Sequence, residues 1–323
     1  TITMKKIILA ISIFTLVLSC SKEDTPTVEQ EKPVDFYAVG GNYPTSGSSR
    51  AILWKNGVAT FLTDGTYQAR AYSVYVDQGN TYVVGEENGQ ARYWKNGVLQ
   101  DMGILTADYF TNVQVVNNKV YILGRDGSEI KLWEDSVPTT ITGFSGTNPY
   151  PCGFKVVGND KYVLIHSDNT SNLWKNGTNT VLSDGIKLDT TRDLCVVGSN
   201  TYVLAEESYN GARKLKYWKN GVANYINNPS NNVRAFHIDV YNSNVYIGGA
   251  LDYKAHYWKN GVATQVGLSS ENSFNYGIKV LDNNIYTINL DNNNASFMKN
   301  KSQVFNDIVT FSPDLYDCFV VYK

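Results

Sequence analysis

The sequence Trp54-Lys55-Asn56-Gly57 recurs along the chain and decides the fold. Close copies begin at Trp94, Trp174, Trp218 and Trp258, and weaker copies are Trp133-Glu134-Asp135-Ser136 and Met298-Lys299-Asn300-Lys301. Successive copies are separated by 40, 39, 41, 44, 40 and 40 residues. Self-similarity at a fixed period of this size indicates a repeat protein, in which every repeat is one supersecondary unit.

The repeat that covers residues 73–104 contains four short apolar runs. Val74 and Val76 alternate with polar residues, and further runs cover 82–85, 91–94 and 98–102. The runs are joined by turn sequences such as Asn96-Gly97, which favours a tight hairpin because both of its residues need positive φ. Runs of this length without helical periodicity predict a four-stranded antiparallel meander, and hence an all-β fold.

Alignment of the repeats predicts how the strands are shared between the two ends of the chain. First strands end at Val76, Val115, Val156, Val196, Val240, Val280 and Val321, and second strands carry Tyr82, Tyr121, Tyr162, Tyr202, Tyr246 and Tyr286, with Tyr37 in the first repeat. The first repeat lacks a first strand of its own, whereas Cys318–Tyr322 aligns with first strands. Seven sheets that are apolar on both faces can bury them by radial closure. We therefore predict a seven-bladed β-propeller over residues 34–323, in which the C-terminal strand completes the N-terminal blade.

The stretch from Ala91 to Gly103, which contains Tyr93-Trp94-Lys95-Asn96-Gly97-Val98, resembles the repeat of HAF-type extracellular propeller-like proteins. The resemblance covers the third and fourth strands of most blades and weakens at Trp133-Glu134-Asp135-Ser136 and at Met298. It implies an extracellular repeat protein without a settled activity. The motif residues have a structural explanation, so no functional residue is carried over.

The N-terminus has the pattern of an export signal. Lys5 and Lys6 precede an apolar run at 7–18, which is shorter than the roughly 20 residues needed to cross a bilayer. Val17-Leu18-Ser19-Cys20 resembles the lipobox of bacterial lipoproteins, which implies that residues 1–19 are a signal peptide and that Cys20 is lipidated. An ordinary secretory signal with an incidental cysteine is the alternative.

The segment after Cys20 predicts a surface address. Ser21-Lys22-Glu23-Asp24 resembles the short acidic signal of surface-exposed lipoproteins of the Bacteroidetes. Residues 20–33 contain almost nothing to bury and are expected to be a disordered tether. We therefore expect a lipid-anchored protein of the outer membrane that faces the cell exterior.

Composition excludes several classes of function. The net charge is −2 and there is no basic run, so nothing indicates nucleic-acid binding. Three histidines at 166, 237 and 256 lack metal-site spacing, and we expect no metal and no cofactor. Besides Cys20 the chain has Cys152, Cys195 and Cys318, which we interpret as buried free thiols, with a Cys152–Cys195 bridge as the alternative. We expect a monomeric propeller.

The two faces of the propeller are expected to differ. Turns between first and second strands, and between third and fourth, are short in every repeat. The other connections are long, at 143–152, 184–193, 227–236 and 269–276, with 42–49 and 206–213 beside them. Binding residues usually lie on long loops held by a rigid scaffold. The candidate binding residues on this face are Tyr109, Phe144, Tyr150, Asp189, Arg192, Arg234, His237, Phe274, Tyr276 and Tyr316.

Two further sets of aligned residues are expected on the axis and on the short-turn face. Tyr75, Gln114, Lys155, Cys195, Asp239, Lys279 and Val320 share one position on the first strands and suggest a wet central channel. Lys55, Lys95, Lys175, Lys219, Lys259 and Lys299 would lie on the membrane side, drawn to anionic head groups or simply solvating exposed turns.

These features predict a surface-anchored binding module without catalytic activity, which recognises a glycan, a peptide or a protein through the long-loop face. Aromatic side chains interleaved with charged ones suit flat stacking and charge-assisted hydrogen bonds. One alternative is a structural subunit of an outer-membrane protein assembly. Another is a hydrolase or lyase that uses carboxylates such as Asp189 and Asp193 at the channel mouth.

Overall fold

The computed structural model describes residues 32–102, 107–144, 146–183, 187–227, 230–267, 272–292, 294–306 and 313–323. Residues 34–323 form one compact unit and residues 1–33 are a separate unit. The predicted signal peptide, Cys20 and nearly all of the predicted tether lie outside the described residues. The described part contains no helix long and apolar enough to cross a membrane.

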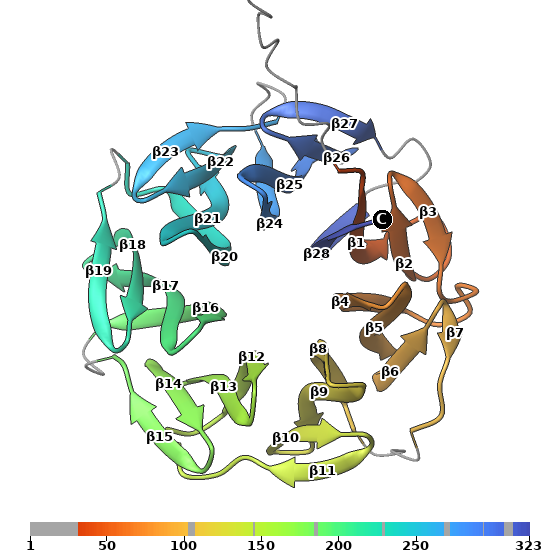
Figure 1. Ribbon diagram of the computed structural model, residues 1–323, viewed down its shortest axis with the longest axis horizontal. Coiled ribbons are helices and arrows are strands. Elements are labelled where there is room, and N and C mark those ends of the chain that lie inside the picture. The colour runs from red at the N-terminus through yellow and green to blue at the C-terminus, as the bar shows by residue number, and fades with distance from the viewer. Residues whose placement is uncertain are drawn as a thin grey trace, which may run out of the picture. The chain divides into compact units, whose positions relative to one another are not determined.

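Seven four-stranded antiparallel sheets surround a central axis, as predicted for a seven-bladed propeller (Figure 1). In strand order from the axis outward, blade 1 is β28 (Pro313–Tyr322), β1 (Val34–Asn42), β2 (Arg50–Lys55) and β3 (Val58–Phe61); blade 2 is β4 (Ala69–Asp77), β5 (Asn80–Glu87), β6 (Gln90–Lys95) and β7 (Val98–Leu99); blade 3 is β8 (Tyr109–Val116), β9 (Lys119–Asp126), β10 (Glu129–Glu134) and β11 (Val137–Thr140); blade 4 is β12 (Tyr150–Val157), β13 (Asp160–Ser167), β14 (Thr170–Lys175) and β15 (Thr178–Val181).

The remaining three blades follow the same order. Blade 5 is β16 (Leu188–Val197), β17 (Asn200–Tyr209), β18 (Ala212–Lys219) and β19 (Val222–Ile226); blade 6 is β20 (Val233–Tyr241), β21 (Asn244–Leu251), β22 (Lys254–Lys259) and β23 (Val262–Gln265); blade 7 is β24 (Ser273–Leu281), β25 (Asn284–Asp291), β26 (Asn294–Lys299) and β27 (Ser302–Asn306). The first strand of each blade in this order, here called the inner strand, lies nearest the central axis (Figure 1).

The two ends of the chain close the ring. β28 pairs with β1 along its length, from Val34 opposite Tyr322 to Asn42 opposite Pro313. Antiparallel pairing satisfies the backbone groups that would otherwise be exposed on the edge of β1. The predicted completion of the N-terminal blade by the C-terminal strand is therefore confirmed.

The predicted alignment of β28 with the other inner strands is wrong by one residue. Tyr37 lies opposite Phe319, just as Tyr82 lies opposite Tyr75 in blade 2. Phe319 rather than Val320 therefore faces the channel, and its ring lies 4.8 Å from that of Tyr75. Val320 instead packs against the cluster between blades 7 and 1. A shift of one residue moves a strand side chain to the opposite face.

The recurring motif has a structural role in every blade. Trp54, Trp94, Trp133 and Trp258 are at most 1% exposed and fill the space between blades. The turn asparagines have positive φ, for example 48° at Asn260. The side chain of Asn260 accepts a hydrogen bond from Val245 N (2.9 Å) and donates one to Asn244 Oδ1 (2.8 Å). The asparagine thus shapes the turn and fastens the neighbouring second strand.

The motif lysines contact the tyrosines of the second strands. The Nζ atom lies 4.9–5.8 Å from the centre of the tyrosine ring in six pairs, which are Lys55–Tyr37, Lys95–Tyr82, Lys175–Tyr162, Lys219–Tyr202, Lys259–Tyr246 and Lys299–Tyr286. Cation–π contacts at exposed sites contribute about 0.5–1 kcal/mol each. The lysine positions therefore have a local explanation within each blade.

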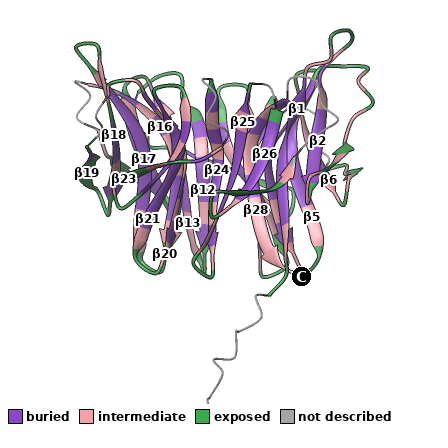
Figure 2. Cartoon of the chain, turned by 90° about the horizontal axis from the view of Figure 1, so that it is seen from above, coloured by how far each residue is buried: buried purple, intermediate pink, exposed green. Residues whose placement is uncertain are grey.

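The predicted loop at 206–213 is instead a hairpin. β17 and β18 contain 10 and 8 residues, against 8 and 6 in blade 6, and only Asn210-Gly211 separates them. The four additional residues account for the repeat step of 44. Exposed residues gather at the turns of both faces and on outer strands such as β19, whereas the strands nearer the axis are largely buried or half-buried (Figure 2).

Candidate functional site

Each of the seven inner strands carries a β-bulge at the same position. In blade 2 the pairing skips one residue between Ala71 and Ser73, and in blade 5 it skips one between Thr191 and Asp193. A bulge places two residues opposite one and redirects a side chain. The seven bulged residues are Tyr72, Thr111, Cys152, Arg192, Phe236, Tyr276 and Tyr316.

All seven bulged residues line one pocket of about 420 Å³, here called the mouth pocket. It lies at the long-loop end of the inner strands. Volumes of about 300–1,000 Å³ are typical of small-molecule sites, which are largely apolar with a few placed polar groups. The shared bulge therefore turns a seven-fold backbone pattern into one binding-sized concavity.

The side chains around the mouth pocket are unequal. Phe236, Tyr276, Tyr316 and Tyr72 belong to four successive blades and form what we call the aromatic arc. The Phe236 and Tyr276 rings lie 4.6 Å apart, and the Tyr316 and Tyr72 rings lie 5.0 Å apart and almost perpendicular. Arg192 and smaller residues occupy the remaining three blades. The guanidinium of Arg192 lies 5.9 Å from the centre of the Phe236 ring, so the pocket places flat apolar faces beside a cation.

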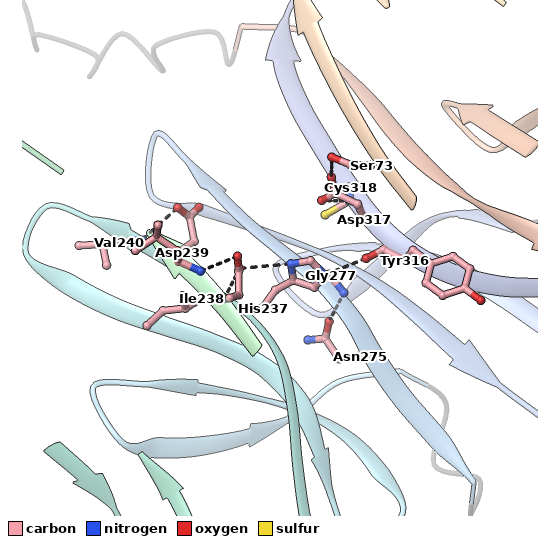
Figure 3. Close-up of polar contacts among 12 residues, drawn as sticks. Ser73, His237, Ile238, Asp239, Val240, Asn275, Gly277, Tyr316, Asp317 and Cys318 are labelled. Atoms are coloured by element: carbon pink, nitrogen blue, oxygen red, sulfur yellow. Dashed lines mark hydrogen bonds and ion pairs between the residues drawn. The ribbon is translucent and has the colours of Figure 1, made fainter. Parts of the chain in front are cut away.

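In several blades the residue after the bulge has a side chain that links neighbouring blades, whereas in blades 4 and 7 this residue is Gly153 or Gly277. Asp193 accepts hydrogen bonds from Leu194 N (2.7 Å) and from Ile238 N of the next blade (3.0 Å). Asp317 accepts from Cys318 N (2.8 Å), from Ser73 Oγ (2.8 Å) and from Val74 N (3.2 Å), as part of the network in Figure 3. These carboxylates hold the inner strands together. Asp317 also lines the mouth pocket, and the layer that contains Asp193, His237 and Asp317 is here called the floor.

His237 crosses the floor between blades 5 and 1. Its Nδ1 lies 3.3 Å from Asp193 Oδ2, and its Nε2 donates to the backbone oxygen of Tyr316 at 2.8 Å (Figure 3). Gly277 occupies the equivalent position in the intervening blade 7, where an added Cβ would lie 2.8 Å from Cys318 Sγ. Burial disfavours the charge of His237, but Asp193 outweighs it and raises the pKa of His237 above its usual value.

The layer below the floor is also charged. Asp239 accepts hydrogen bonds from Val240 N (3.0 Å) and Val280 N (2.7 Å), and so joins blades 6 and 7. Burial opposes the charge of Lys279, yet Asp239 and Asp317 raise its pKa. With Lys155 in the same polar cavity, the expectation of a polar channel agrees with the structure.

The structure brings five of the ten candidate residues to the mouth pocket: Tyr150, Arg192, His237, Tyr276 and Tyr316. Two more pack beside it. The ring of Tyr109 lies 5.9 Å from that of Tyr150, and the ring of Phe274 lies 6.0 Å from that of Tyr276.

The other three candidates lie elsewhere. Asp189 is only 1% exposed and its carboxylate lies 2.7 Å from Lys216 Nζ, so it supports blade 5 from within. Phe144 packs against the apolar cluster between blades 3 and 4. Arg234 stands beside the pocket, with its guanidinium 3.6 Å from Glu206.

Four of the seven bulged residues were missed by the sequence analysis: Tyr72, Thr111, Cys152 and Phe236. Each bulged residue stands three positions before the channel residue of its strand, as Tyr72 stands before Tyr75. That spacing was the available signal. The inner strands also begin earlier than predicted, within segments that were expected to be loops. Arg192 and Tyr276 therefore lie in β16 and β24.

Two titratable side chains of the mouth pocket have shifted pKa values. Burial raises the pKa of the Cys152 thiol to about 12. Burial and the nearby Arg192 charge lower the pKa of His166, whose Nδ1 lies 3.3 Å from Thr191 Oγ1. Cys152, Cys195 and Cys318 are all free thiols. Among the described residues no group of three or more His, Cys, Asp or Glu could hold a metal ion.

Solved structures share this architecture at low sequence identity. A protein from Bacteroides uniformis, named as a candidate 6-phosphogluconolactonase, is 14% identical over 90% of this chain and 100% of that chain, with a TM-score of 0.53. The extracellular domain of a candidate hybrid two-component system from B. thetaiotaomicron is 11% identical over 82% of this chain and 34% of that chain, with a TM-score of 0.52.

A structure from a study of two prolyl endopeptidases is 12% identical over 88% of this chain and 50% of that chain, with a TM-score of 0.50. Neither a protein-family model nor a curated protein matches the sequence. At these identities the likeness shows the fold alone, and one fold hosts many functions. The function therefore has to be argued from the residues of the mouth pocket.

Proposed function

We propose that the protein is a binding module without catalytic activity, which recognises a small polar ligand with a flat face, such as a glycan end, in the mouth pocket. The observation that carries this proposal is the set of seven bulges, which aim seven side chains of five kinds into one cavity of about 420 Å³. A backbone feature repeated in every blade builds the cavity, while unlike side chains give it chemical selectivity.

The pocket chemistry supports binding rather than turnover. An enzyme with a carboxylate pair needs two carboxyl groups of opposed character facing one substrate. Here Asp193 is committed to two backbone N–H groups and His237, and Asp189 is buried against Lys216. The aromatic arc and Arg192 are instead suited to stacking and charge-assisted hydrogen bonding.

We propose a location on the cell surface, which is supported by the predicted lipobox at Cys20 and by the place where β1 begins. β1 begins at Val34, next to the short turn at Asn56, whose N donates to Phe36 O at 2.8 Å. An anchored tether joined there would leave the mouth pocket open on the other face. The resemblance of the repeats to HAF-type extracellular proteins supports the same cell-surface location.

A structural subunit of an outer-membrane assembly is the second candidate. Its support is a set of equivalent valines on the outer strands that are 63–69% exposed: Val58, Val98, Val137, Val222 and Val262. Each lies on a different blade, and singly scattered apolar residues are normal on protein surfaces. The mouth pocket therefore supports ligand binding more strongly.

The test is a glycan and peptide array screen with residues 34–323, which contain all the strands of the closed ring. The wild-type domain is compared with a variant that carries Tyr276→Ala and Tyr316→Ala, and with Lys219→Ala on the short-turn face as control. We expect ligands that the aromatic-arc variant loses by about tenfold or more, as for central aromatic anchors. Binding that survives in this variant would move the site elsewhere and overturn the proposal.

A further inference from the structure

A cluster of cations surrounds one buried carboxylate beside the mouth pocket. Glu206 is 1% exposed and accepts a hydrogen bond from Ala235 N at 2.9 Å. The guanidinium of Arg192 lies 3.1 Å from this carboxylate, and those of Arg213 and Arg234 lie 3.6 Å from it. Three cations facing one anion leave an excess of positive charge at the mouth.

Arg192 presents this excess charge to the pocket. It is the bulged residue of blade 5, and its side chain is 25% exposed. Its Nε is buried without a hydrogen-bond partner in the described part of the chain. A buried donor left unsatisfied is destabilising, and more so when it is charged. A ligand oxygen at Arg192 would remove this cost.

An unsatisfied acceptor lies elsewhere on the wall of the same pocket. Asn112 Oδ1, two blades from Arg192, is buried and has no hydrogen-bond partner among the described residues. A hydroxyl group can donate to this oxygen, whereas a carboxylate cannot. The pocket is therefore complementary to a ligand that carries both an anionic group and a hydroxyl group.

The other charged groups that border the pocket are already matched. Asp317 accepts hydrogen bonds from Cys318 N, Ser73 Oγ and Val74 N, and Lys279 lies close enough for their charges to interact. His237 is paired with Asp193. The cation that remains for a ligand is therefore Arg192, supported by Arg213 and Arg234.

We infer that the mouth pocket binds an acidic sugar, a pyranose that carries a carboxylate. The carboxylate lies on Arg192, a ring face stacks on the aromatic arc and a hydroxyl donates to Asn112 Oδ1. This inference rests on the proposed function and names its ligand class. A sugar satisfies the arc, the cation and the orphan acceptor together, whereas an acidic peptide side chain offers the anion alone.

The test compares acidic and neutral sugars of equal length. Isothermal titration calorimetry of residues 34–323 is run with galacturonate and glucuronate trisaccharides and with the corresponding galactose and glucose trisaccharides. Hydrogen bonds to charged groups contribute about 1.5–3 kcal/mol, which corresponds to a preference of about 10- to 100-fold. We expect the acidic sugars to bind more tightly by that factor, and the preference to shrink in high salt.

Three variants assign the preference to Arg192. Arg192→Gln should abolish the discrimination between acidic and neutral sugars, while Glu206 keeps two guanidinium partners. Arg192→Lys keeps the charge but loses the planar fork, so we expect an intermediate preference. Lys214→Gln removes an exposed charge from the same hairpin and should leave both affinities unchanged. The ratio of two affinities within one folded variant is insensitive to modest losses of stability.

The outcomes separate the inference from the proposed function. Equal affinity for acidic and neutral sugars, both lost in the aromatic-arc variant, would overturn the acidic-sugar inference and leave the binding function standing. Binding of an Asp-rich peptide without binding of any sugar would also overturn it. The absence of any ligand from the full array would count against the proposed function itself.

Discussion

The two faces of the propeller use the same repeat in opposite ways. On the short-turn face, the motif asparagines have similar backbone angles and make similar hydrogen bonds, such as Asn96 Oδ1 with Thr81 N (2.9 Å) and Asn260 Oδ1 with Val245 N (2.9 Å). At the mouth, the bulge is repeated in all seven blades but the bulged side chain ranges from Thr111 to Arg192. One face repeats both geometry and chemistry, and the other repeats geometry alone.

This difference separates residues that stabilise the fold from residues that can recognise a ligand. A position that repeats in chemistry satisfies a local requirement that every blade shares. A position that repeats in geometry but varies in chemistry is held by the blade and is free to serve a site formed by all blades together. Changes on the short-turn side should therefore alter stability, and changes at the mouth should alter binding.

The largest effect should come from opening the ring, because both faces exist only while β28 completes blade 1. Removal of residues 313–323 exposes the whole edge of β1 and the cluster around Phe36. We expect loss of soluble folded protein, measured by expression yield and near-UV circular dichroism, whereas removal of Lys323 alone should have no effect. A truncated protein with native stability would contradict the closed ring.

A motif tryptophan should cost much more stability than a mouth residue. Trp258 is fully buried between blades 5 and 6, and replacing a buried aromatic residue by alanine costs about 3–5 kcal/mol. We expect Trp258→Ala to lower the free energy of unfolding by that amount in urea titrations and to leave the ligand preference of the folded fraction intact. Thr111→Ala at the mouth should cost less than about 1 kcal/mol, so equal losses at both positions would erase the distinction.

The sequence predicted the residues that repeat in every blade far better than the residues of the mouth pocket. Trp, Asn and Gly recur visibly because each satisfies a local rule, and they were sufficient for blade number and ring closure. The bulge leaves no composition signal, since Thr111, Cys152 and Phe236 share nothing but their position. The predicted alignment of the last strand was also one residue out, since Phe319 rather than Val320 lies opposite Tyr37.

The candidate residues were partly predictable for the same reason. Arg192, Tyr276 and Tyr316 were identified because they are aromatic or charged residues near the expected long loops, and they line the pocket. Asp189 carries the same kind of signal but pairs with Lys216, whose position depends on the extended hairpin of blade 5. A contact across strands of this kind depends on register, which one sequence does not reveal.

The floor of the mouth should respond to pH on two sides. Burial opposes the charge of Asp193, but His237 outweighs it and lowers the pKa of Asp193 to about 2, below the value near 3.9 of an unfolded chain. Its stabilisation is present above about pH 4 and is lost as the pH falls through the folded pKa. The pKa of His237 is raised above about 6.5, so its stabilisation is complete below that pH and is lost as the pH rises through the folded pKa.

The pair should therefore contribute most between about pH 4 and pH 6.5. We expect the urea midpoint of the wild-type domain to fall on the alkaline side of this window, and the fall to be smaller in His237→Gln, which cannot titrate. Identical alkaline slopes for the two proteins would show that His237 is not the group responsible. His256→Gln is the matched control, because His256 lies on the third strand of blade 6, away from Asp193, and its Nδ1 lies 2.8 Å from the backbone oxygen of Lys254.

The smallest effect tests whether the short-turn face really repeats its chemistry. Asn260→Ala loses the hydrogen bonds to Val245 N and Asn244 Oδ1 and places alanine at a φ of 48°, for an expected cost of about 1–2 kcal/mol. Asn260→Gly should cost less, because glycine adopts positive φ without strain and only the hydrogen bonds are lost. The equivalent changes at Asn96 should give nearly the same pair of values in urea titrations, since its turn has the same geometry. Costs that differ widely between the two blades would mean that the shared motif hides blade-specific packing, and that the short-turn face is as individual as the mouth.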